Sequence, residues 1–196
     1  MRAVRRVEAR AVPLDRRDVD TDQIIPSAWL KRVERTGYAA GLFEAWRRDP
    51  AFVLNDPRYA GAGILLAGAN FGCGSSREHA VWALQEHGFR AVIAPAFADI
   101  FRANCARVGL VAAVLPEAAV ERLMRAVEAD PALTLTVDVE ARTVSGAGET
   151  QPFPLDDFTR MRLLEGLDDI GLTLRHAQDI AAYETRRPAH LPRIRD

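Results

Sequence analysis

The chain has 196 residues, of which 48% are hydrophobic and 27% charged, and its formal net charge at pH 7 is −1. These values predict a single globular domain with an ordinary buried core, and the balanced charge argues against nucleic acid as a partner. No segment reaches the roughly 20 apolar residues of a membrane span and the N-terminus has no apolar signal region, so we expect a cytoplasmic protein with no membrane partner.

Cys73 and Cys105 are the only cysteines in the chain. They are too few and too far apart for a disulfide framework, a zinc site or a self-contained iron–sulfur cluster. We therefore expect no metal site within this chain.

The first predicted element is a half-buried strand within residues 2–14, where apolar and charged residues alternate until a proline closes the run. The next loop places Asp18, Asp20 and Asp22 within five residues, but it lacks the glycine and the final glutamate of an EF-hand loop. We interpret these carboxylates as turn formers that accept hydrogen bonds from the backbone.

Two short helices are predicted at 27–32 and 38–48, and the connection then continues to about residue 63. Connections of this length are often functional. Trp29, in the first of these helices, is interpreted either as a core residue or as the wall of a pocket.

From residue 63 the pattern becomes regular. Strands are predicted at 64–69, 90–94 and 110–115, and helices at 76–87, 97–107 and 116–129, with glycine or proline at several helix ends. This βαβαβα order implies parallel strands. The turn after the first of them then lies at the carboxyl edge of the sheet, where open α/β folds bind their ligands.

After residue 131 the apolar period changes to two, which predicts strands at 133–139, 141–144 and 151–155. Helices are predicted at 156–165 and 176–186, with Gly166 and Gly171 interrupting the stretch between them, and the end from Pro188 is expected to be mobile. The predicted fold class is α/β, with a mostly parallel core sheet and a small additional antiparallel layer, in one domain spanning 1–196.

The turn between the first strand and helix of the regular region reads Ala67-Gly-Ala-Asn-Phe-Gly-Cys-Gly-Ser-Ser-Arg-Glu-His79. Its glycines allow positive φ angles, and Ser75, Ser76 and Arg77 are predicted on the first exposed turn of the helix, where free N–H groups attract an anion. The guanidinium of Arg77 matches a carboxylate. The turn therefore predicts a binding site for a small acidic molecule.

A purely structural interpretation of the same residues is also open, because Ser75-x-x-Glu78 has the pattern of a capping box. The turn matches neither the dinucleotide fingerprint, nor a P-loop, nor the nucleophile elbow of a serine hydrolase. A hydrolase would need a histidine and an acid near Ser75, and His79 is one helical turn further on.

Two segments, Asp20-Thr-Asp-Gln-Ile-Ile-Pro26 and Asn70-Phe-Gly-Cys-Gly-Ser-Ser-Arg-Glu-His79, resemble the swivelling β/β/α domain of the aconitase superfamily. Within that superfamily the chain is most similar to the bacterial 3-isopropylmalate dehydratase small-subunit family. Further segments agree in the same order, so that the resemblance covers nearly the whole chain: 35–37, 52–55, 93–100, 166–174 and 180–184.

The resemblance implies a hydro-lyase that is active only as a heterodimer with the 3-isopropylmalate dehydratase large subunit. The large subunit binds a [4Fe-4S] cluster, and this chain does not. The implied reaction interconverts 2-isopropylmalate and 3-isopropylmalate by dehydration and rehydration in leucine biosynthesis. By position in the motif, Ser75 corresponds to the serine base, Arg77 to the arginine that binds a substrate carboxylate, and Ser76 to a substrate contact.

Substrate choice is assigned to the segment after Pro26, where Trp29 and Leu30 are expected to line an apolar part of the pocket. Lys31 leaves a homoaconitase-like hydro-lyase as an alternative, since it could meet the charge of a longer dicarboxylate. Helical spacing points Lys31 away from Trp29 and favours isopropylmalate. A stand-alone module that binds a carboxylate or phosphate ligand is the remaining alternative.

Overall fold

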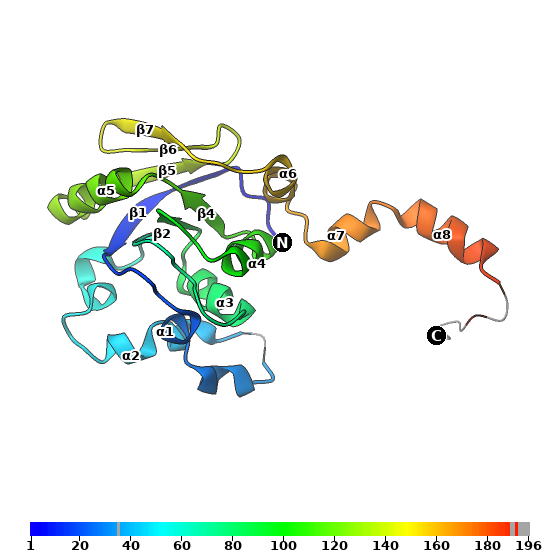
Figure 1. The fold of residues 1–196 in the computed structure, drawn as a ribbon, viewed down its shortest axis with the longest axis horizontal. Coiled ribbons are helices and arrows are strands. Elements are labelled where there is room, and N and C mark those ends of the chain that lie inside the picture. The colour runs from blue at the N-terminus through cyan, green and yellow to red at the C-terminus, as the bar shows by residue number, and fades with distance from the viewer. Residues whose placement is uncertain (35, 189–190, 192–196) are drawn as a thin grey trace.

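The computed structural model describes residues 1–34, 36–188 and 191 (Figure 1). Among these residues there are seven strands: β1 (Arg6–Leu14), β2 (Ile64–Ala67), β3 (Ala91–Ala94), β4 (Val111–Val114), β5 (Thr134–Asp138), β6 (Thr143–Gly146) and β7 (Glu149–Pro152). The α-helices are α1 (Thr21–Ile24), α2 (Glu44–Arg47), α3 (Glu78–His87), α4 (Asp99–Val108), α5 (Glu117–Ala129), α6 (Asp157–Glu165), α7 (Asp169–Leu174) and α8 (Ala177–Arg186). Four short 3-10 helices lie in the connection between α1 and β2: η1 (Ser27–Lys31), η2 (Tyr38–Gly41), η3 (Val53–Asn55) and η4 (Pro57–Tyr59).

The strands form one sheet in the order β4-β3-β2-β1-β5-β6-β7. The four strands from β4 to β1 are parallel, with Val12 paired to Leu65, Leu65 to Val92 and Val92 to Ala112. The pairs from β1 through β7 are antiparallel. The predicted α/β class is therefore confirmed, and the expected antiparallel strands join the parallel core edge to edge through β1.

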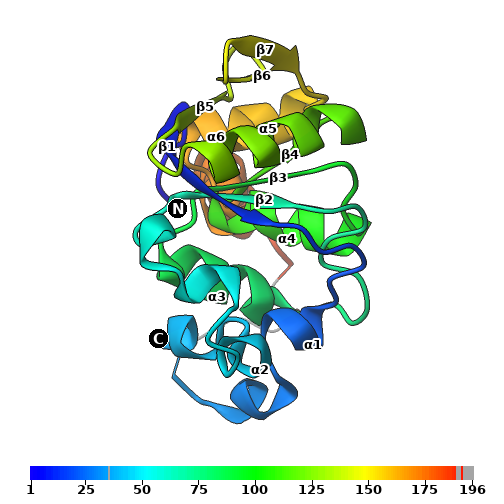
Figure 2. The same cartoon turned by 90° about the vertical axis from the view of Figure 1, so that its left-hand side faces the viewer.

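Helices cover both faces of the parallel core: α5 lies on one face, and α3 and α4 lie on the other (Figure 2). Every residue of β2 and β3 is buried, as expected for parallel strands that are covered on both sides. This explains why the two strands appear in the sequence as continuous apolar runs. The order β2-α3-β3-α4-β4-α5 confirms the predicted βαβαβα unit.

Several predicted boundaries need correction. Helix α3 begins at Glu78, two residues later than predicted, and the expected helix at 38–48 is divided by Phe43, whose φ is 50°. Residues 27–31 form a 3-10 helix and not an α-helical turn. Gly171 lies within α7, where the Asp168 carboxylate accepts a hydrogen bond from its backbone N–H over 2.7 Å.

Helices α7 and α8 extend from the body of the molecule as an arm (Figure 1). The arm buries none of its residues, and the large apolar side chains Ile170, Leu174 and Tyr183 are more than half exposed. Most of the end that was expected to be mobile lies outside the described residues. None of the described helices is long and apolar enough to cross a bilayer.

Candidate active site

The turn predicted to bind an acid lies at the carboxyl edge of the parallel strands, between β2 and α3. It is held on two sides by neighbouring loops: Cys73 bridges to Asp20 in the loop after β1, and Phe71 bridges to Phe97 in the loop after β3. Three loops from three adjacent strands therefore meet at one point, as the topology of an open α/β sheet predicts.

Gly72 shows why this turn needs glycine. Its φ is 78°, a conformation that side chains disfavour, and its N–H donates to the carbonyl of Val19 over 2.7 Å. A Cβ at this position would overlap the ring of Phe101. The glycine therefore lets the turn lie directly against the first turn of α4.

Ser75, Ser76 and Arg77 line a common pocket of about 270 Å³. The same turn contributes Gly72 and Gly74 to this pocket, and α1 contributes Thr21. The remaining lining residues lie at the start of α4: Ala98, Asp99, Ile100 and Phe101. The predicted serine and arginine positions thus share a pocket with Asp99 and with apolar residues at the start of α4.

Two helices begin at this pocket without a side-chain cap: α3, whose N-cap is Arg77, and α4, whose N-cap is Ala98. A helix N-terminus presents unpaired N–H groups and a partial positive charge, which favour an anion. The contribution of α4 was not predicted, because its start is 24 residues downstream of Ser75 and only the fold brings the two together.

The capping-box interpretation of Ser75 and Glu78 is wrong. Ser75 and Ser76 precede α3, and the position that caps this helix belongs to Arg77. A capping box does occur at α1, where Asp20 accepts from the Gln23 backbone N–H and the Gln23 side chain accepts from the Asp20 N–H. The Asp20 bond agrees with the prediction that these acids form turns.

The guanidinium of Arg77 is bound by the Asp22 carboxylate. Nη2 donates to Oδ2 over 2.7 Å, and Nη1 donates to Oδ1. The Arg77 side chain is 14% exposed, whereas that of Asp22 is 55% exposed. The predicted carboxylate-binding fork is therefore already oriented on a carboxylate of the same chain.

Trp29 and Leu30, the predicted substrate contacts, do not line this pocket. The Trp29 indole N–H donates to Glu44 over 2.6 Å and lowers the pKa of that carboxyl group. The Trp29 ring also packs against Gly41, so closely that a Cβ at position 41 would overlap the ring. Leu30 is half-buried and Lys31 is exposed on the same 3-10 helix. Contact of Trp29 and Leu30 with substrate stays a prediction.

His79 packs its ring against Tyr38 and Trp82, with centroids 5.2 Å and 4.7 Å away, and it does not line the Ser75 pocket. This packing makes His79 a supporting residue of α3 and gives no arrangement of a serine nucleophile with a histidine base.

Both cysteines of the chain are free thiols, Cys73 partly buried and Cys105 buried. Burial and the nearby Asp20 and Asp18 carboxylates raise the pKa of Cys73, and complete burial raises the pKa of Cys105 far above its ordinary range. Among the residues that the structure describes, no group of three or more His, Cys, Asp or Glu side chains could hold a metal ion. The described residues therefore do not fit an iron–sulfur cluster.

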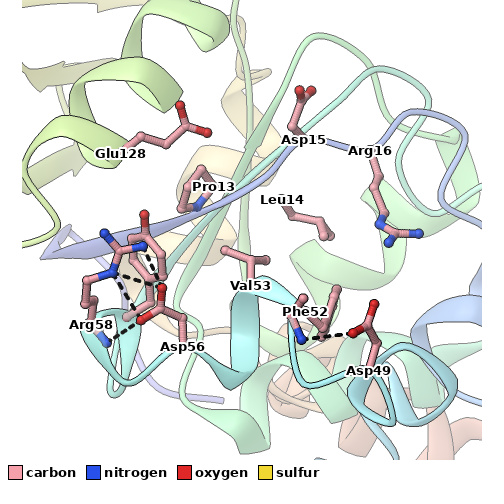
Figure 3. A pocket seen from close by; sticks show the side chains of 12 residues that line it. Pro13, Leu14, Asp15, Arg16, Asp49, Phe52, Val53, Asp56, Arg58 and Glu128 are labelled. Atoms are coloured by element: carbon pink, nitrogen blue, oxygen red, sulfur yellow. Dashed lines mark hydrogen bonds and ion pairs between the residues drawn. The ribbon is translucent and has the colours of Figure 1, made fainter.

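A larger pocket of about 500 Å³ lies beside the end of β1 and shares no residue with the Ser75 pocket (Figure 3). Its walls carry Asp15, Asp49, Asp56 and Glu128 against only two arginines, and one of these, Arg58, is paired with Asp56. Such a charge pattern repels an acidic ligand. We therefore favour the Ser75 pocket over this larger pocket as the site for an acidic molecule.

Three protein-family models match successive parts of this chain. The Aconitase C-terminal domain model matches residues 1–118, which contain the whole pocket. The model for the C-terminal domain of the 3-isopropylmalate dehydratase small subunit matches residues 169–194, and the LeuD_N model matches residues 121–157.

Among curated relatives, the 3-isopropylmalate dehydratase small subunit of Parafrankia sp. is 68% identical over 93% of this chain and 94% of the relative. The same subunit from Rubrobacter xylanophilus is 59% identical over 99% of this chain and its full length. The crystal structure of 3-isopropylmalate dehydratase from Methanocaldococcus jannaschii superimposes with a TM-score of 0.64 at 26% identity, covering 91% of this chain and 99% of that one.

Proposed function

The chain belongs to the 3-isopropylmalate dehydratase small-subunit family, and we propose that the pocket of Ser75, Ser76 and Arg77 is its share of a composite active site. The reaction is the interconversion of 2-isopropylmalate and 3-isopropylmalate, a step of leucine biosynthesis. The partner is the large subunit of the same enzyme, and the complex is cytoplasmic. One observation carries the proposal: a serine, a second hydroxyl and an arginine meet at two uncapped helix starts.

Ser75 acts as the base. Its alkoxide takes a proton from the carbon next to the one that bears the hydroxyl group, the C–O bond breaks, and hydroxide leaves to give isopropylmaleate. Re-addition of the proton and hydroxide with their positions exchanged gives the isomer. A positioned base of this kind contributes on the order of 10²–10⁴ in rate.

A serine is a base only where its alkoxide is stabilised. The starts of α3 and α4 supply partial positive charge to the pocket, and Arg77 adds a guanidinium that is paired with Asp22. Each helix terminus is worth about 0.3–1 kcal/mol when exposed, and more once a docked partner excludes water.

Arg77 and Ser76 hold the substrate. The guanidinium provides N–H donors in the planar arrangement that a carboxylate accepts, and the Ser76 hydroxyl provides a further donor beside the base. Ala98, Ile100 and Phe101 line the same pocket as Asp99, and their apolar side chains have the chemistry for an alkyl substituent.

The described residues of this chain do not fit a cluster, so we assign the [4Fe-4S] group to the large subunit. When bound there, it supplies Lewis-acid chemistry to the leaving hydroxyl and a carboxylate of the substrate. Activity therefore requires the complex, and this chain alone is inactive.

The test is co-production with the large subunit of the same organism, followed by an assay of isopropylmalate interconversion. Ser75→Ala should reduce kcat by at least about 100-fold while assembly of the two subunits is unchanged. Ser145→Ala in β6 is the matched control and should keep full activity. Normal turnover in Ser75→Ala, or activity of the chain without a partner, would contradict the proposal.

A further inference from the structure

A further pocket, of about 510 Å³, lies at the amino edge of the parallel strands, and we call it the amino-edge pocket. Its lining includes Arg90, which directly precedes β3, and Gly109, which lies two residues before β4. The Ser75 turn, in contrast, follows the carboxyl end of β2. The two pockets share no residue, so a ligand in the amino-edge pocket is separate from the proposed active site.

Three arginines from different parts of the chain line the amino-edge pocket: Arg2, Arg90 and Arg107. The first precedes β1, the second lies between α3 and β3, and the third lies in the last turn of α4. The N-terminal segment packs against the turn after α4, since a Cβ at Gly109 would lie 3.5 Å from the carbonyl of Arg2 (Figure 1). The fold therefore brings three guanidinium groups to one pocket.

Asp168 is the only carboxylate among the described residues that line this pocket. It is the N-cap of α7, and its Oδ1 accepts the Gly171 N–H over 2.7 Å. Its Oδ2 accepts from the Met1 amino group over 3.4 Å. The Asp168 carboxylate is therefore bound by groups other than the three arginines.

Two of the three arginines have no carboxylate partner. Arg107 lies 3.7 Å from Asp169, but that carboxylate is bound more closely by Arg162, over 2.8 Å. Among the described residues, neither Arg2 nor Arg90 takes part in an ion pair, and the Nε–H of Arg90 is buried without a hydrogen-bond acceptor. Guanidinium groups that the protein leaves without a counter-charge favour an anion that supplies one.

The ends of α3 and α4 act against an anion at this place, because each helix C-terminus carries about half a negative charge. Side-chain and turn hydrogen bonds satisfy part of this charge: Gln85 donates to the Val108 carbonyl over 2.8 Å, and the Gly109 N–H donates to the Cys105 carbonyl over 3.0 Å. Three full positive charges exceed the two partial charges and that of Asp168 together. The pocket therefore keeps a net positive charge.

We propose that the amino-edge pocket binds a small molecule that carries carboxylate or phosphate groups. Guanidinium groups bind both kinds of oxyanion through paired N–H donors. The volume of about 510 Å³ lies within the range of roughly 300–1,000 Å³ that small-molecule sites occupy. Because the pocket lies at the other edge of the sheet from Ser75, the bound anion takes no part in the chemistry there. This inference does not depend on the proposed function.

An NMR titration of the full chain tests the proposal, with phosphate and succinate as separate probes at low ionic strength, where screening is weakest. The backbone amide signals of Arg90, Gly109 and Asp168 should shift in a saturable way, with a Kd on the order of 1 mM or tighter. Saturation by phosphate alone would identify a phosphate-bearing ligand, and saturation by succinate alone a carboxylate. The absence of a saturable shift with both probes would overturn the proposal.

Substitution of the arginines tests whether they form the site. Arg90→Gln and Arg2→Gln should each raise the Kd about tenfold or more, because each removes charge-assisted hydrogen bonds to the anion. Arg2 is exposed, so its substitution provides the test if Arg90→Gln does not fold. Wild-type affinity in the folded variants would contradict the assignment.

Two further variants serve as controls. Arg122→Gln removes the same charge from α5, where Arg122 pairs with Glu149 and lines neither pocket, so it should change the Kd by less than about twofold. Arg77→Gln alters the Ser75 pocket and should leave the shifts at Arg90 unchanged. Binding that is lost in Arg77→Gln but kept in Arg90→Gln would place the anion at the Ser75 pocket and overturn this inference alone.

Discussion

The hydroxyl of Thr21 donates a hydrogen bond to the carbonyl oxygen of Ser75 over 2.9 Å. Thr21 is only 2% exposed, so its hydroxyl cannot exchange this bond for one to bulk water. Thr21, at the start of α1, therefore fixes the backbone of the proposed base.

Thr21→Val should weaken both fold and activity. Valine has nearly the same shape but removes the hydrogen bond to the Ser75 carbonyl, whose net contribution is about 0.5–1.5 kcal/mol. For a chain of this size each kcal/mol lowers Tm by roughly 2–4 °C. Thermal unfolding and kcat of the complex measure the two effects. Thr21→Ser keeps the hydroxyl and should retain more of both, and equal losses in the two variants would show that the methyl group matters more than the hydrogen bond.

Gly72→Ala should destabilise the chain more than Gly88→Ala. Both glycines have positive φ, so each substitution carries backbone strain of about 1–2 kcal/mol. A Cβ at Gly72 also overlaps Phe101, whereas at Gly88 nothing lies within 4 Å. The difference between the two variants in denaturant unfolding therefore reports the overlap. Equal stability would mean that α4 can move away from the turn at little cost.

Lys31→Ala should change isopropylmalate turnover by less than a few-fold, because Lys31 is exposed and does not line the Ser75 pocket. Trp29→Ala should impair turnover, and the structure adds a reason: Trp29 bonds Glu44 and packs against Gly41, so its removal loosens the 3-10 helix at 27–31. Steady-state kinetics with isopropylmalate and with homocitrate measure both. A complex that prefers homocitrate, and loses this preference in Lys31→Ala, would contradict the substrate assignment.

Stability should fall as pH rises above about 8.5, where a cysteine in the unfolded chain begins to ionise. Burial raises the pKa of Cys105 in the folded state, so the folded chain keeps a proton that the unfolded chain loses. The unfolded state then binds fewer protons, and the free energy of unfolding decreases by up to about 1.4 kcal/mol per pH unit.

The measurement is denaturant unfolding of wild type and Cys105→Ala between pH 8 and about 10.5. Below pH 8 the Cys105 thiol is protonated in both the folded and the unfolded chain, so it adds no pH dependence to stability. The slope of stability against pH should be smaller in Cys105→Ala, because this variant removes that thiol and leaves the tyrosines and Cys73 in place. Parallel slopes would show that Cys105 ionises equally in both states.

Much of this molecule follows from local patterns in its sequence. Buried strands such as β2 and β3 appear as continuous apolar runs, and helices α3 and α4 end where Gly88 and Gly109 stop them. These features depend on residues a few positions apart, so local conformational preferences determine them. The same patterns placed the Gly72 turn at the carboxyl edge of the sheet, and the resemblance of its motif indicated the family.

The composition of the site depended on the tertiary structure. Ser75-x-x-Glu78 satisfies the local rule for a capping box, yet the turn is held instead by Thr21 and by the bridge from Cys73 to Asp20. Asp22 meets Arg77 across 55 residues, and the start of α4 reaches the pocket only because β3 lies beside β2. Such contacts form when the sheet brings distant loops to one edge, and no short-range pattern in the chain encodes which side chains then meet.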